Sequence, residues 1–234
     1  MSDKNKIKWD EDLSGPFVII YFNKINGDLK IVCDIMSFIP VYKKCDCNNF
    51  FVGTHINLLG DIAKEKIDKI SVVDLILNEI ITYPYTAFEN IKQIAPASVN
   101  FWSNEKKKNN LTQCIYWEPV EPKKIISINK LSKKLNDSFN RYVDCISNTN
   151  SKVASFLSGG EDSRVVIDKL SQCKNVDSFI FSENLNRETD IALRVSNEYK
   201  TNLKICKREK SYYYDILESS SDLVGICGDY THAH

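Results

Sequence analysis

A short glycine loop between an apolar run and an amphipathic stretch constrains this chain more than any other feature. The loop reads S-G-G-E-D-S over Ser158–Ser163, follows the apolar run Lys152–Leu157, and precedes a stretch in which Val166, Ile167 and Leu170 have helical spacing. A loop that leaves a parallel strand and enters a helix gathers free backbone N–H groups at the positive end of the helix dipole. The sequence therefore predicts an anion site at this turn.

The residue types in the loop suit phosphate in particular. Gly159 and Gly160 let the backbone approach phosphate oxygens closely and adopt positive φ, while Ser158 and Ser163 add hydroxyl donors. Asp162 can take Mg²⁺, which bridges phosphates through carboxylate and water ligands. The spacing and lysine of the Walker loop are missing. The alternative is an ordinary strand-to-helix turn with a capping aspartate.

Strand and helix patterns alternate after residue 121. A long helix is expected from about Asn129 to Ser147, and shorter patterns predict strands at 152–157, 176–181 and 203–206, with a helix at 188–199. This alternation implies right-handed crossovers, and we expect a buried first strand in a parallel sheet with helices on both faces.

The first half has a different pattern, of short apolar runs separated by turn residues. Strands are expected at 17–22, 29–33, 40–42, 50–52, 99–102 and 113–117, with a hairpin turn at Asn26–Asp28. A helix is expected at Val72–Ile81, with Ser71 and Asp74 as its N-terminal cap. The proline-containing segment Trp117–Pro122 is the best linker, so we divide the chain into domains 1–120 and 121–234.

Composition narrows the class of protein. Lys plus Arg and Asp plus Glu are equal at 31 each, so the net charge offers no general attraction for nucleic acid or anionic membrane. Met1–Asp12 lacks an apolar signal region, and no run approaches the length of a membrane span, so we expect a cytoplasmic protein. The eight cysteines are scattered, and we expect reduced thiols; Cys45-Asp46-Cys47 has C-x-C rather than C-x-x-C spacing.

The segment Leu157–Arg164 resembles the S-G-G-x-D-S signature of the ATP pyrophosphatase (PP-loop) superfamily, and its flanks look most like asparagine synthetases. Ser178–Ser182 resembles the second strand of the synthetase sheet, whose backbone usually reads adenine. Glu188 and Ala192 match the acid and alanine of the next helix. Upstream, Gly15–Leu29, Cys33–Tyr42 and Tyr85–Ala97 are similar to the later half of a class II glutamine amidotransferase domain.

The resemblance implies a fold in two parts. The first is an α+β half, mainly antiparallel β and a shortened relative of the amidotransferase domain. The second is an incomplete α/β parallel-sheet domain of the PP-loop, adenine nucleotide α-hydrolase type.

The resemblance also implies a reaction. A substrate carboxylate attacks the α-phosphate of ATP, pyrophosphate leaves, and ammonia or an amine attacks the acyl-adenylate. ATP and Mg²⁺ are the implied cofactors, with Asp162 holding the metal through ATP, and a carboxylic acid and an amine or ammonia are the implied small-molecule partners. Arg164 either pairs with phosphate or lies on the helix surface. The implied ATP and pyrophosphate residues are Leu157, Ser158, Gly159, Gly160, Asp162, Ser163, Arg164, Phe181 and Ser182.

Two departures from the family limit what the resemblance implies. Residue 2 is Ser2, where a glutaminase needs an N-terminal cysteine, and the first cysteine is Cys33 inside an expected strand, so we expect no glutaminase activity. The family's second loop, S-G-x-G-x-D-E, is not matched by Gly225–Asp229. We therefore expect a truncated chain, a partner or a homo-oligomer that supplies the rest. His232 and His234 either serve a metal or belong to a frayed terminus.

Two further functions stay open on sequence grounds. One is a non-catalytic nucleotide-binding or scaffolding remnant, or one piece of a split synthetase. The other is a different PP-loop activity, such as tRNA thiolation or amidation of a nicotinate precursor.

Overall fold

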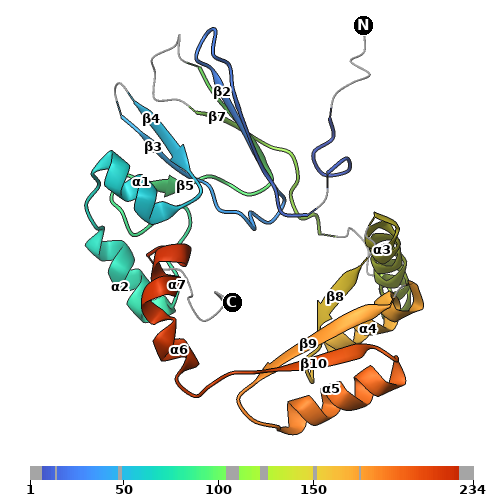
Figure 1. Ribbon diagram of the computed structural model, residues 1–234. Helices are drawn as coiled ribbons and strands as arrows, with labels where there is room; N and C mark the ends of the chain where they lie inside the picture. The colour runs from blue at the N-terminus through green and yellow to red at the C-terminus, as the bar shows by residue number, and fades with distance from the viewer. Residues whose placement is uncertain are drawn as a thin grey trace, which may run out of the picture. The chain divides into compact units, whose positions relative to one another are not determined.

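The chain folds into two separate units. A computed structural model describes residues 7–13, 15–46, 49–103, 111–121, 126–149, 152–173 and 175–226. Contacts join the chain up to Val120 with the segment from Ile216 onward into the first unit, and Glu121–Asp215 form the second (Figure 1). We expected 121–234 to form one domain, whereas the contacts assign its last segment to the first unit.

The first unit contains two antiparallel sheets (Figure 1). One has the order β1-β2-β6-β7, with β1 at Val18–Phe22, β2 at Leu29–Cys33, β6 at Ser98–Trp102 and β7 at Thr112–Ile115. The other has the order β4-β3-β5, with β4 at Phe50–Gly53, β3 at Tyr42–Cys45 and β5 at Lys92–Gln93. The predicted hairpin at Asn26–Asp28 is confirmed, because β1 and β2 pair across it. The strand expected at 40–42 instead begins at Tyr42.

Residues from both sheets form the core between them. Leu29, Ile31 and Cys33 of β2 are buried with Val41 and Ile94, which flank β3 and β5. Burial of such side chains is the main favourable term in folding. On the same side, the rings of Phe50 and Trp102 stack with centroids 5.5 Å apart. The two sheets are therefore held together by one apolar layer.

A second cluster lies on the opposite face of the β4-β3-β5 sheet, as the alternation of side chains along β4 requires. Phe51 packs there against Ile56 and Leu59 of helix α1 (Ile56–Ala63), and Phe88 closes over Gly60. A Cβ at Gly60 would lie within 2.8 Å of three atoms of the Phe88 ring, so this close approach needs glycine. Helix α1 was not anticipated from the sequence.

Helix α2 (Lys69–Asn78) begins three residues before its expected start at Val72. Its N-cap is Asp68, whose carboxylate accepts from the Ile70 N–H at 3.0 Å. Ser71, the expected cap, lies inside the first turn and donates its hydroxyl to Asp68 Oδ2 at 2.8 Å. The prediction of Ser71 and Asp74 as the cap was therefore wrong. Asp74 instead accepts from the Thr82 N–H at 2.7 Å, beyond the end of the helix.

Helix α7 (Leu217–Val224) returns the chain to the first unit. The carbonyl of Asp222 lies 2.8 Å from His55 Nε2, and the Ile226 N–H donates to Asn57 Oδ1 at 2.7 Å. Ile226 packs against the cluster beside α1, and the preceding residue, Gly225, has φ +78°. The segment is thus anchored by polar contacts to both ends of one short stretch, His55–Asn57.

The second unit contains a parallel sheet in the order β10-β9-β8 (Figure 1). The α/β alternation expected here is confirmed, with bounds that differ from the predicted ones by a few residues. The elements are α3 (Ile128–Thr149), β8 (Val153–Phe156), α4 (Glu161–Cys173), β9 (Val176–Ser182), α5 (Arg187–Glu198), β10 (Asn202–Lys207) and α6 (Tyr212–Asp215).

The expectation of helices on both faces of this sheet was wrong for the described residues. The strands add in one direction, so right-handed crossovers place α4 and α5 on the same face. Val143 of α3, Ile167 of α4 and Ala192 of α5 share one core cluster with Val176 and Ile180 of β9. The opposite face is open, and the expected burial of the first strand fails there, since Phe156 is 66% exposed.

Candidate nucleotide site

The glycine loop lies at the carboxyl end of β8 and leads directly into α4. Ser158 Oγ accepts from the Gly160 N–H at 3.2 Å and lies 3.0 Å from Ser163 Oγ. The Ser163 hydroxyl also lies 3.1 Å from the Ser158 carbonyl and 3.2 Å from the Gly160 carbonyl. The two serines therefore close the loop on itself, and both Ser158 and Gly160 remain exposed to solvent.

One loop glycine makes a close contact that the sequence did not predict. Neither Gly159 nor Gly160 has positive φ, so the prediction of left-handed backbone was wrong. A Cβ at Gly159 would lie 3.1 Å from the Cα of Glu188, in the first turn of α5. Gly159 thus permits a close approach between the loop and the next helix, and Glu188 marks that contact.

Two carboxylates lie in the first turn of α4 and both are exposed. Glu161 lies 3.8 Å from the guanidinium of Arg164, which also donates from Nε to the Gly160 carbonyl at 3.2 Å. Arg164 therefore lies along the helix and supports the loop in this conformation. Asp162 is exposed in the first turn of α4, where a carboxylate would oppose a bare phosphate but would favour one that carries Mg²⁺.

The residues present fit a magnesium ion only if phosphate supplies most of its ligands. In the described ranges, no group of three or more His, Cys, Asp or Glu side chains is arranged to hold a metal. Asp162 can contribute one oxygen, and Mg²⁺ is commonly bound through one or two carboxylates together with substrate phosphates and water. His232, His234 and Cys47 lie outside the described residues.

The remaining predicted residues lie around the same edge of the sheet. Leu157 is fully buried in the core, and its N–H donates to the Phe179 carbonyl at 2.8 Å, so its side chain cannot reach a ligand at the loop. Phe181 is 37% exposed and faces the open side of the sheet. Ser182 ends β9 and donates its hydroxyl to the Asn184 carbonyl at 2.5 Å.

A cavity of about 390 Å³ lies at the ends of β9 and β10. Sequence reasoning found two of its lining residues and missed the rest. The strongest signal for the others is position, because Arg208 directly follows the third strand and therefore reaches the same sheet edge as the glycine loop. The cavity is lined by Phe181, Ser182, Glu183, Asn184, Asn186, Arg208 and Tyr213.

In the first unit, Cys33 and Asp34, which belong to the segment compared above with an amidotransferase, are both buried. Burial raises the pKa of the Cys33 thiol to about 11, so the thiol is protonated and is no nucleophile at neutral pH. Asp34 is 2% exposed, and its carboxylate accepts from the N–H groups of Phe17, Met36 and Phe38. This aspartate therefore fixes the turn after β2.

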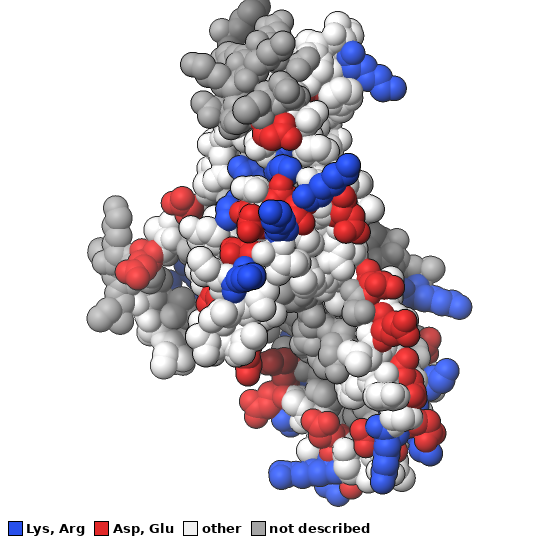
Figure 2. All heavy atoms as spheres, turned by 90° about the vertical axis from the view of Figure 1, so that its left-hand side faces the viewer, with Lys and Arg blue, Asp and Glu red and all other residues white. Residues whose placement is uncertain are grey.

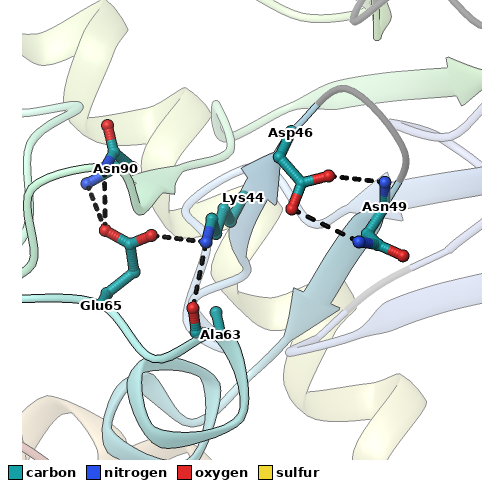
Figure 3. A network of polar contacts seen from close by, with 6 residues as sticks. All are labelled: Lys44, Asp46, Asn49, Ala63, Glu65 and Asn90. Carbon is teal, nitrogen blue, oxygen red and sulfur yellow. Dashed lines mark hydrogen bonds and ion pairs between the residues drawn. The ribbon is translucent and has the colours of Figure 1, made fainter.

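Of the ion pairs among the described residues, the closest lies in the first unit and is structural (Figure 3). Lys44 of β3 contacts Glu65 and donates to the Ala63 carbonyl at the end of α1, while Glu65 accepts from Asn90. The pair thereby joins a strand, a helix end and a loop. On the face seen in Figure 2, charges of both signs are interspersed.

The chain matches no family model, and it matches none of the curated proteins. Within the described ranges, no helix combines the length and apolar character needed to cross a membrane.

Proposed function

We propose that the second unit binds Mg²⁺-ATP at Ser158–Ser163 and serves as the adenylating part of an amide-forming ligase of the asparagine synthetase type. The observation that carries the proposal is the closed, solvent-facing loop between β8 and the first turn of α4. The sequence resemblance supplies the reaction class, and the loop geometry supplies a place where phosphate oxygens would meet backbone N–H groups.

In this proposal the first-turn N–H groups of α4 and the hydroxyls of Ser158 and Ser163 hold the pyrophosphate. Asp162 would hold Mg²⁺ together with phosphate oxygens, and the ion would supply positive charge beside the departing pyrophosphate. The Ser163 hydroxyl and the Gly160 N–H are bonded within the loop, so both donors would exchange these partners for phosphate oxygens when the ligand binds. A carboxylic acid and ammonia or an amine are the other substrates, and glutamine hydrolysis is not part of the activity.

A binding experiment tests the nucleotide site first. Titration calorimetry of the full chain with ATP and Mg²⁺ should give saturable binding, and Asp162→Ala should weaken it by about tenfold, or 1.4 kcal/mol. Asp168→Ala is the matched control, because this carboxylate lies on the same helix and contacts Gln172 and Lys169 rather than the loop. If both substitutions weakened ATP binding equally, the proposal that Asp162 belongs to the binding site would be wrong.

Turnover is then measured as pyrophosphate release with a panel of carboxylic acids, with and without ammonia. Release that requires both ATP and one acid supports the ligase. Binding that depends on Asp162 but gives no pyrophosphate with any acid would replace the ligase by the alternative function, a nucleotide-binding module.

A further inference from the structure

Planar side chains form a row across the three strand ends of the second unit. The rings of Phe156 on β8 and Phe181 on β9 have centroids 5.7 Å apart. The guanidinium of Arg208, which follows β10, lies 4.5 Å from the centroid of Phe181 and 5.1 Å from that of Tyr212. All four groups lie within one unit, on or next to the open face of the sheet.

Arg208 is held in this row by several contacts. Its N–H extends the strand pairing to the Ser182 carbonyl at 3.0 Å, and its Nη1 donates to the Tyr213 hydroxyl at 2.9 Å. Its Nε is enclosed and has no hydrogen-bond partner among the described residues. A guanidinium placed in this way loses little freedom when a ligand binds beside it. It is also the one cation among the residues that line the 390 Å³ cavity.

The cavity is placed where the base of a nucleotide would lie. The glycine loop follows β8, and Arg208 follows β10, two strand spacings away, which is roughly 10 Å. The two sites are also linked by the start of α5, because Gly159 abuts Glu188 while the N-cap Asn186 lines the cavity. A ligand with its phosphates on the loop would therefore extend across β9 toward Arg208.

We propose that Arg208, held by Tyr213, is a base-binding residue of this site, and that the ligand is a purine nucleoside triphosphate. The inference rests on the proposed function, since it takes the phosphates to lie on the glycine loop. A guanidinium donates only, and purines offer ring-nitrogen acceptors. Purines also present a larger π-face than pyrimidines to the neighbouring planar groups, and stacking and cation–π contacts both grow with that overlap.

The test separates base from phosphate. Wild type, Arg208→Ala and Arg208→Lys are titrated with Mg²⁺-ATP, Mg²⁺-CTP and Mg²⁺-tripolyphosphate. Arg208→Ala should weaken the binding of ATP about tenfold and change the binding of tripolyphosphate by less than about twofold. The affinities for ATP and CTP should therefore become more similar. Arg208→Lys keeps the charge but loses the plane, and should narrow the ATP-to-CTP ratio in the same way. Circular dichroism melts check that each variant is folded.

Lys204→Ala is the matched control, since Lys204 is an exposed cation on the same face of β10. The inference would be overturned if Arg208→Ala weakened the binding of ATP and of tripolyphosphate equally, or if Lys204→Ala weakened ATP binding as much as Arg208→Ala does. Either result would mean that Arg208 acts only through its positive charge. An unchanged ATP affinity in Arg208→Ala would also overturn it. Failure of the proposed function is distinct, because wild type would then bind neither ATP nor tripolyphosphate, or Asp162→Ala would have no effect.

Discussion

Replacement of Lys44 by Met isolates a largely buried carboxylate and gives a measurable test of the first unit. Lys44 Nζ lies 2.5 Å from Glu65 Oε1, and the two side chains are 14% and 6% exposed (Figure 3). Met keeps most of the aliphatic length of Lys44 beside the Phe51 ring, whose centroid lies 5.7 Å from Nζ. The substitution therefore removes the charge with little change in packing.

The expected cost follows from what remains around Glu65. Its Oε2 still accepts from Asn90, at 2.9 Å from the side chain and 3.2 Å from the backbone. Removing one partner of a buried pair typically costs 3–5 kcal/mol. Because these two hydrogen bonds remain, we expect Lys44→Met to lower the unfolding free energy by about 3 kcal/mol at pH 7. The double variant Lys44→Met, Glu65→Gln should recover more than about 1 kcal/mol of that loss, since no charge is then left buried.

The stability lost in Lys44→Met should depend on pH, because the pair includes a carboxylate that titrates. Burial opposes ionisation of Glu65, but the hydrogen bonds and charge of Lys44 together with Asn90 outweigh it, and the folded pKa lies below the ordinary 4.5. The pair therefore stabilises the fold above about pH 4.5, and this contribution is lost as pH falls through the folded pKa. Without Lys44 the carboxyl protonates more readily, so the deficit of Lys44→Met should shrink between pH 7 and pH 4.

Urea unfolding followed by tryptophan fluorescence measures this change in the right unit, because Trp9, Trp102 and Trp117 all precede residue 121. Glu65→Gln alone completes the double-mutant cycle. A deficit below about 1 kcal/mol at pH 7 would refute the reasoning. A deficit that grows as the pH falls would refute it equally, since the isolated carboxylate would then not be the cause.

Two further predictions concern the first unit. Gly225→Ala should destabilise it by more than about 2 kcal/mol in the same urea assay, since φ is +78° and the new Cβ would lie 2.7 Å from Ile56 Cγ2. Gly15 has φ +89° but open space around it, so Gly15→Ala should cost only the backbone strain of about 1 kcal/mol. Equal losses of stability in the two variants would show that the contact with Ile56 does not contribute. Mass spectrometry after thiol labelling at pH 8 should find Cys114 modified and Cys33 intact until urea unfolds the chain, because Cys33 is buried and burial raises its pKa to about 11. Rapid native labelling of Cys33 would contradict that account.

The second unit could be predicted closely from the sequence because its signals are local. The apolar run before the glycine loop, the loop itself and the periodic helix after it each specify one element, and these elements follow in order. The side of the sheet on which the helices lie is different, because it depends on the order of the strands, which no local pattern encodes. The open face that exposes Phe156 was missed for this reason.

The first unit was harder to predict because its helices carry apolar residues on more than one side. Ile70 and Ile76 of α2 are 81% and 73% exposed, so the apolar spacing fixed the existence of a helix but shifted its start. Helix α1 is capped by His55, a residue outside the usual cap types, so the sequence lacks a recognisable start signal for this helix. Arg208 was missed because a single arginine in a polar run has no pattern, and its role depends on rings that the fold brings to it.

The return of the chain at Ile216 has a consequence for synthesis on the ribosome. The cluster around Ile56 and Phe88 includes Ile226, which is translated only after the whole of Glu121–Asp215. At usual rates of elongation, that interval is roughly 5 to 20 seconds. During it, the surface that later receives α7 stays uncovered while the second unit is already able to fold. The first unit is therefore the first to begin synthesis and the last to be completed.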